Sequence, residues 1–87
     1  MYVIIVYDVC VERVNKVCQF LRQYLNWVQN SVFEGETTEA ELLKIENGLK
    51  RIIDLEKDSI GIYVLSSEKF LKRKYLGVRK AETGSII

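Results

Sequence analysis

The chain has 87 residues, of which 48% are hydrophobic and 29% are charged, and its formal net charge is +1. This composition is typical of one folded domain and excludes an intrinsically disordered chain. No apolar run approaches the roughly 18–20 residues that a membrane span needs, and no basic region precedes the apolar start, so we expect a cytoplasmic protein with no membrane partner.

The chain contains no histidine, and this limits the chemistry that it can perform. Acid–base work would have to use carboxylates, Lys, Tyr, Cys or a metal-bound water, which excludes histidine-based triads and histidine-dependent ribonuclease mechanisms. Cys10 and Cys18 do not have the spacing of a zinc site. We expect both to be free and to pack as small hydrophobic residues.

The first predicted element is a strand over residues 2–9. Its odd-numbered residues share one face and its even-numbered residues share the other, and both faces are apolar until Asp8. Such a strand is expected to be central and covered on both sides. A charge at its end is therefore the feature that needs an explanation.

A helix is predicted over residues 11–25, where apolar residues recur at steps of three and four. Arg13 and Lys16 fall on its polar side, which we expect to face water. Residues 27–36 are rich in β-formers, and an interruption near Asn30 indicates two short strands.

A second helix is predicted over residues 37–54, where Thr38 and Glu41 fit a capping box. Gly48 weakens this helix slightly. Residues 59–66 form another strongly apolar strand. From Glu68 onward the chain is basic and irregular, with at most one helical turn at 68–72.

The order of elements predicts an α+β fold, a ferredoxin-like β-α-β-β-α-β sandwich over residues 1–67 followed by a basic tail over residues 68–87. Both helices then lie on one face of the sheet. The strongest strands are apolar on both faces and the tail is too polar to cover the second one. We therefore expect a two-fold homodimer through the helix-free sheet faces.

Asp8 has two interpretations at this stage. A lone aspartate at the end of a strand often starts a turn or caps the next helix. In the expected dimer, however, two copies of Asp8 would approach each other, and a hard cation such as Mg²⁺ between them would offset their repulsion. Such an ion could polarise a phosphate or activate a water.

The basic tail also has two interpretations. Six of the thirteen basic residues lie between residues 69 and 80, whereas eight of the twelve acidic residues lie between 34 and 58. The tail is either a solvated surface that keeps the protein soluble or a strip that binds phosphates. In the second case Lys72, Arg73 and Lys74 would contact nucleic acid, and Arg13 and Lys16 would add positive charge near Asp8.

Several segments together resemble the CRISPR-associated protein two family: YDV after an apolar first strand, VQNSVFEGE running into TTEAEL, and DSIGIYVL. The resemblance covers roughly residues 2–66, and VQNSVFEGE is its most specific part. It implies a homodimeric, metal-dependent endonuclease of antiviral defence that cuts single-stranded RNA or, in some members, double-stranded DNA. It also implies a subunit of the spacer-integration complex, with the CRISPR-associated integrase (protein one) as partner.

The resemblance assigns Asp8 as the catalytic, metal-binding residue. It places Tyr7, Arg13, Ser31 and Phe33 at positions that contact or frame the site. The chain departs from many relatives at Trp27, where they carry a basic residue, and in its tail, where residues 85–87 are a candidate for a strand that pairs with the partner subunit. Two alternatives remain beside the nuclease: a non-catalytic dimeric scaffold that bridges integrase dimers and holds DNA, and an RNA-cutting toxin on the same fold.

Overall fold

The computed structural model describes residues 1–78, and its centre is a four-stranded antiparallel sheet. The strand order is β2 (Asn26–Gln29), β3 (Val32–Glu36), β1 (Tyr2–Asp8) and β4 (Ser59–Leu65). β1 is therefore central, with antiparallel partners on both sides. The two flanking strands provide hydrogen-bond partners for the backbone of β1. The apolar side chains of β1 point to both faces of the sheet, so both faces need cover.

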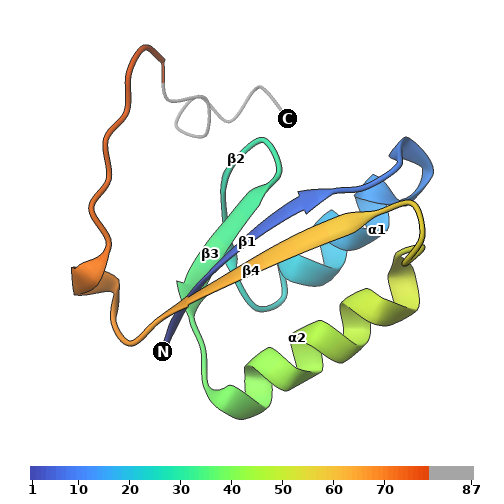
Figure 1. Cartoon of the computed structure of the whole chain (residues 1–87), viewed down its shortest axis with the longest axis horizontal. Helices are drawn as coiled ribbons and strands as arrows, with labels where there is room; N and C mark the ends of the chain where they lie inside the picture. Colours follow the sequence, from blue (N-terminus) through green and yellow to red (C-terminus); the bar gives the residue numbers. More distant parts are fainter. Residues whose placement is uncertain (79–87) are drawn as a thin grey trace.

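Two helices, α1 (Val11–Leu21) and α2 (Glu39–Ile52), pack against the same face of this sheet (Figure 1). The fully buried side chains come from β1, α1, β3 and α2: Val3, Ile5, Val17, Leu21, Phe33 and Ile45. The arrangement confirms the predicted ferredoxin-like α+β fold, with the second sheet face left open. Neither helix is long and apolar enough to cross a membrane.

The first helix is shorter than the sequence pattern predicted. It ends at Leu21, and the chain then tightens into a turn in which the amide of Gln23 donates to the carbonyl of Phe20 at 3.2 Å. The prediction of a helix to residue 25 was wrong. Leu25 is buried, as its place in the apolar stripe indicated, but it reaches the core from the turn after the helix. An added Cβ on Gly35 would lie 3.2 Å from its Cδ2 atom, so Leu25 packs directly against β3.

The other local predictions are confirmed within one or two residues. Thr38 accepts from the amide of Glu41 at 3.1 Å, and the Glu41 carboxylate accepts from the amide of Thr38 at 2.9 Å, which is the predicted capping box. Asn30, with a φ of 41°, makes the turn between β2 and β3. Asparagine tolerates this left-handed conformation better than most residues do.

After β4 the chain forms a short 3₁₀ turn, η1 (Glu68–Phe70), and then leaves the sheet as an extended segment (Figure 1). Arg73 in this segment reaches back to the open face of the sheet, so the tail is not detached from the domain. The division of the chain at residue 67 stays a prediction. The candidate strand at residues 85–87 lies outside the described residues.

Candidate active site

Asp8 is the last residue of β1, and its side chain is exposed on the sheet face that the helices leave open. It pairs in register with Ser59, the first residue of β4, whose side chain is also exposed. Tyr7, one residue earlier, points to the opposite face and is buried. The central strand therefore places one carboxylate in water at its end without the cost of burying it.

The open face beside Asp8 is apolar. Val6 precedes Asp8 on this face and is 39% exposed. Ile4 pairs in register with Tyr63 of β4, and Tyr63 is 59% exposed. A sheet face with exposed valine and tyrosine side chains is typical of a surface that binds another protein.

Tyr7, Ser31 and Phe33 support the strand from behind rather than facing the same side as Asp8. The amide of Tyr7 donates to the carbonyl of Ser31 at 3.0 Å. The Tyr7 hydroxyl and the Cys18 sulfur are hydrogen-bonded at 2.9 Å. Burial, and then the contact with Cys18, raise the pKa of Tyr7 well above its ordinary value. Phe33 is fully buried, with its ring centroid 6.1 Å from that of Tyr7, so its place is in the core.

Both cysteines are free, as expected, and Cys18 is buried in the core.

Arg13 does not lie on the solvated side of α1, and that expectation was wrong. Its side chain is 20% exposed, and its Nε and Nη2 atoms donate to the Asp58 carboxylate at 2.6 and 3.0 Å. The side chain of Asp58 is fully buried and also accepts the amides of Cys10 and Asp54, each at 2.9 Å. The Arg13 guanidinium outweighs the effect of burial and holds the pKa of Asp58 well below its usual range.

Asp58 was missed at the sequence level, where it counted among the acidic residues of the segment 34–58. In the sequence, the feature that could have indicated a structural role for Asp58 is its position directly before the apolar strand over residues 59–66.

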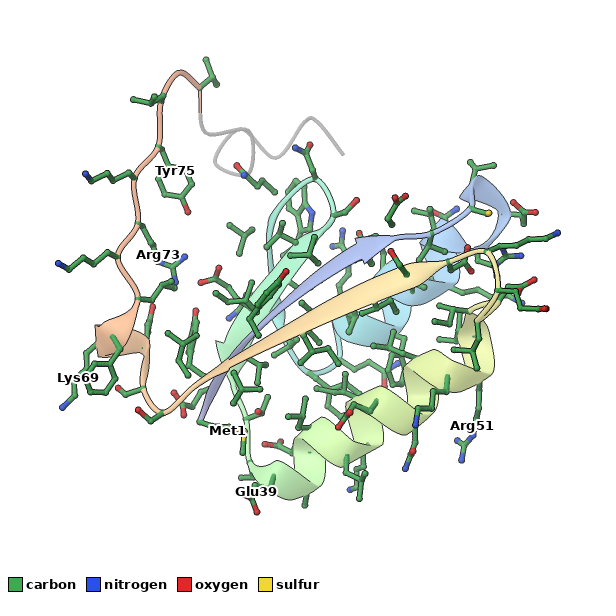
Figure 2. All side chains as sticks on the ribbon, in the orientation of Figure 1. Met1, Glu39, Arg51, Lys69, Arg73 and Tyr75 are labelled. Atoms are coloured by element: carbon green, nitrogen blue, oxygen red, sulfur yellow. The ribbon has the colours of Figure 1, made fainter. Side chains whose placement is uncertain are left out.

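The four remaining predicted nucleic-acid contacts divide into two groups. Lys16, Lys72 and Lys74 are exposed and free to meet a phosphate. Arg73 instead points toward the sheet (Figure 2), where it contacts the carboxylate of Glu34, the Tyr2 hydroxyl at 3.1 Å and Glu68 at 3.3 Å.

Glu34 is the second buried carboxylate that the sequence did not reveal. The Tyr2 hydroxyl donates to it at 2.6 Å. Burial and this hydrogen bond to Glu34 raise the pKa of Tyr2 to about 12. Burial also raises the pKa of Glu34, but the hydrogen bonds from Arg73 and Tyr2 outweigh it and lower that pKa overall.

Within one protomer Arg73 and Asp8 lie at opposite ends of β1. Arg73 binds Tyr2, the first residue of the strand, whereas Asp8 is its last residue. Six steps along an extended strand correspond to about 20 Å. Within the part of the chain that the structure describes, Arg73 is therefore held far from the Asp8 carboxylate of the same protomer.

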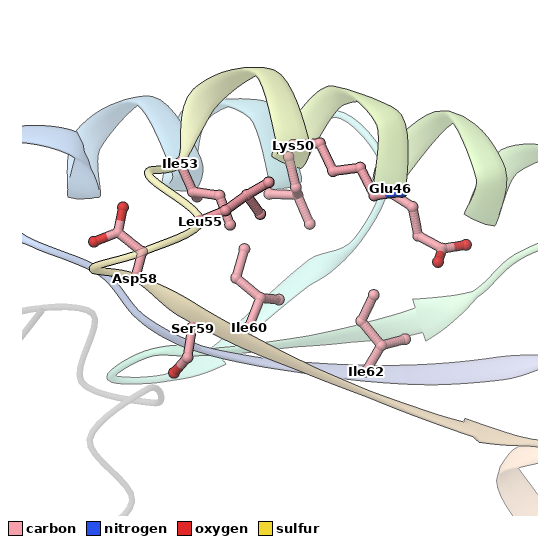
Figure 3. A pocket seen from close by; sticks show the side chains of 9 residues that line it. Glu46, Lys50, Ile53, Leu55, Asp58, Ser59, Ile60 and Ile62 are labelled. Atoms are coloured by element: carbon pink, nitrogen blue, oxygen red, sulfur yellow. The ribbon is translucent and has the colours of Figure 1, made fainter.

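A groove of about 320 Å³ lies between α2 and β4 on the helix side of the sheet (Figure 3). Its lining is mostly aliphatic: Glu46, Leu49, Lys50, Ile53, Leu55, Asp58, Ser59, Ile60 and Ile62. Asp8 is not among these residues, and the carboxylate of Asp58 is already engaged by Arg13. The groove is therefore not the candidate active site.

These features define a class of protein, a small ferredoxin-like domain with one exposed carboxylate at the end of its central strand and a sheet face that its helices leave open. The family model described as CRISPR associated protein Cas2 matches residues 1–73. The chain belongs to this family.

Individual relatives agree with the family model. The chain is 59% identical to the CRISPR-associated endoribonuclease Cas2 of Methanosarcina acetivorans and 58% identical to that of Pyrococcus furiosus, in both cases over the full length of both chains. Among solved structures, one titled "Crystal structure of cas2" has a TM-score of 0.87 at 51% identity, covering 93% of this chain and 91% of that one. The Streptococcus pyogenes Cas2 structure at pH 6.5 has a TM-score of 0.79 at 37% identity, covering 88% of this chain and all of the other.

Proposed function

We propose that this protein is a divalent-metal-dependent endonuclease that cleaves single-stranded RNA and acts as a homodimer joined through its open sheet faces. The observation that carries the proposal is the position of Asp8, an exposed carboxylate at the end of a strand that is otherwise apolar. The names of the relatives from M. acetivorans and P. furiosus, both endoribonucleases, support the choice of RNA.

The dimer follows from the uncovered face. Val6 and Tyr63 expose apolar surface there, and a two-fold axis near the end of β1 would cover both faces and bring together two copies of Asp8. The exposed Lys16 lies on the helix that follows Asp8 and adds positive charge for a nucleic-acid backbone.

The residues present fit a magnesium ion rather than a zinc ion. Among residues 1–78 there is no group of three or more His, Cys, Asp or Glu side chains that could enclose a metal. Mg²⁺ needs no such cage, because it keeps several waters and binds through one or two carboxylates and the phosphate of its substrate. Asp8 from each protomer supplies such a set, and the ion would contribute polarisation of the phosphate and activation of a water.

The experiment that tests this compares the wild type with Asp8→Asn. We expect the variant to keep the dimer and the fold and to lose Mg²⁺-stimulated cleavage of single-stranded RNA. Glu56→Gln, which neutralises another exposed carboxylate, is the matched control and should retain activity. Cleavage that survives unchanged in Asp8→Asn would show that another residue or a contaminant is responsible. The same assay with double-stranded DNA shows which of the two nucleic acids the protein cleaves faster.

A second function is favoured by the exposed tail lysines, Lys72 and Lys74. In it the dimer is a non-catalytic scaffold of the spacer-integration complex that binds DNA and recruits the CRISPR-associated integrase. Asp8→Asn would then leave DNA binding intact. Lys72→Gln with Lys74→Gln would weaken binding and reduce its dependence on salt.

A further inference from the structure

Asp58 connects three segments that are far apart in the sequence. Its carboxylate accepts the amide of Cys10 in the connection after β1, the guanidinium of Arg13 in the first turn of α1, and the amide of Asp54 in the turn before β4. Its neighbour Ser59 is the residue that pairs with Asp8. The same carboxylate therefore ties together both strand ends that form the candidate active site.

The start of α1 depends on this carboxylate. Cys10 is the N-cap of the helix but makes no side-chain capping bond. A helix start normally needs such a partner for its free amides. Here Asp58 supplies an acceptor from another part of the chain and, through Arg13, a second attachment one turn later. The path of the chain directly after Asp8 is fixed by Asp58 rather than by a local cap.

We infer that Asp58 and Arg13 are positioning residues, which hold the end of β1 so that Asp8 projects from the open face, and that Arg13 is not a nucleic-acid contact. The functional part of this inference rests on the proposed nuclease activity.

Geometry argues against a phosphate contact by Arg13. Two of its guanidinium nitrogens already donate to a buried carboxylate, and the side chain is only 20% exposed. A phosphate that approached the Nε–Nη2 edge would have to displace a bidentate partner that is itself fully buried, which would leave the Asp58 charge uncompensated. Only the outer N–H groups on the Nη1 side remain for a phosphate, and there the Glu12 carboxylate lies 3.8 Å away and would repel it. Lys16, exposed on the next turn of α1, has no such constraint.

Kinetics separate the two roles. If Arg13 is a positioning residue, Arg13→Gln and Asp58→Asn should each lower kcat about tenfold or more, since small displacements of a catalytic group are costly. KM and its dependence on salt should stay unchanged. The double variant should be no slower than the slower single variant, because the two residues act as one unit.

The opposite pattern would overturn the inference. If Arg13 binds phosphate, Arg13→Gln alone should raise KM. It should also lower the slope of log KM against log salt concentration by about one, the value for one lost phosphate contact, while Asp58→Asn should leave kcat unchanged. Lys16→Gln provides the reference for what the loss of one exposed phosphate contact does to KM.

A readout without activity keeps the inference testable if the nuclease proposal fails. Each Asp58 oxygen accepts one backbone amide, so an asparagine side chain could serve only one of them. In Asp58→Asn we expect faster hydrogen exchange at Cys10 or Asp54 and a weaker cross-strand nuclear Overhauser contact between Asp8 and Ser59. If both stay as in the wild type, Asp58 does not position the strand end, whatever the enzyme does.

Two further variants control for folding. Thr38→Ala removes the α2 capping box, at a site that does not touch the Asp58 network, and should lower global stability without changing exchange at Cys10. If Asp58→Asn does not fold, Arg13→Lys takes its place. Lysine keeps the positive charge but cannot make the bidentate contact with Asp58. If Arg13 is a positioning residue, Arg13→Lys should lower kcat at constant KM. If Arg13 binds phosphate, the variant should keep the kcat of the wild type.

Discussion

Gly48 in the middle of α2 offers a direct test of how tightly the two helices pack. Glycine costs a helix about 1 kcal/mol relative to alanine, so Gly48→Ala would stabilise an isolated helix. In this structure an added Cβ would lie 2.0, 2.5 and 2.8 Å from three atoms of the Phe20 ring on α1. Carbon atoms pack at about 3.5 Å or more, so the ring would have to retreat by about 1.5 Å.

We expect the cost of this retreat to exceed the gain in helix propensity. The Phe20 ring is also packed against Tyr24, with the ring centroids 5.4 Å apart, so its movement disturbs a second contact. Inserting atoms into a packed site costs about 1–3 kcal/mol. We therefore expect Gly48→Ala to lower the free energy of unfolding by about 1 kcal/mol, which for a domain of this size corresponds to about 4–8 °C in Tm.

Urea denaturation at one fixed protein concentration measures this change. In a Phe20→Ala background the obstacle is gone, and Gly48→Ala should instead stabilise by up to about 1 kcal/mol. Asn47→Ala, at an exposed neighbouring position of α2, is the control for propensity alone and should stabilise slightly in both backgrounds. A Gly48→Ala variant that is more stable than the wild type would refute the reasoning.

Three other predictions concern the cap, the buried carboxylate and the open face. Thr38→Ala should cost about 1 kcal/mol in urea denaturation, and Thr38→Ser should cost less, because the hydroxyl remains. The pKa of Glu34 is lowered in the folded state, so its contribution to stability is present above the unfolded pKa of about 4.3 and is lost as the pH falls through the folded value. Arg73→Gln should move the carboxyl titration of Glu34, followed by NMR, to higher pH and remove part of that acid sensitivity. Val6→Asp should convert the expected dimer to a monomer in analytical ultracentrifugation, and an unchanged dimer would place the interface elsewhere.

Local sequence patterns were sufficient to predict the architecture. The alternation of residues 2–9 placed Asp8 on the opposite face from Tyr7, which the structure confirms. Thr38 and Glu41 marked the start of α2, and Asn30 marked the turn between β2 and β3. Each of these signals depends on residues within a few positions of one another, where backbone geometry alone determines which side chains meet.

The errors have a different origin, because they involve contacts between distant residues. The end of α1 was placed four residues too late, since nothing near Leu25 indicates that it must pack against Gly35 of β3. The periodicity of α1 put Arg13 in water, but its partner Asp58 is 45 residues away along the chain. Periodicity describes which face of a helix is apolar and carries no information about a buried ion pair at its edge.

Contacts between distant residues also explain why two buried carboxylates were missed. In the sequence Glu34 and Asp58 were counted only among the acidic residues of the segment 34–58, yet each is buried and forms an ion pair with an arginine from a distant element. Asp8 was easier to single out because it breaks an apolar strand, and within residues 1–78 no arginine forms an ion pair with it. A buried carboxylate with an arginine partner serves the fold, whereas an exposed one on an apolar face is available for a cation or a substrate. This contrast in exposure, rather than the number of acidic residues, is the physical basis for proposing Asp8 as the metal-binding carboxylate and Asp58 as the group that positions it.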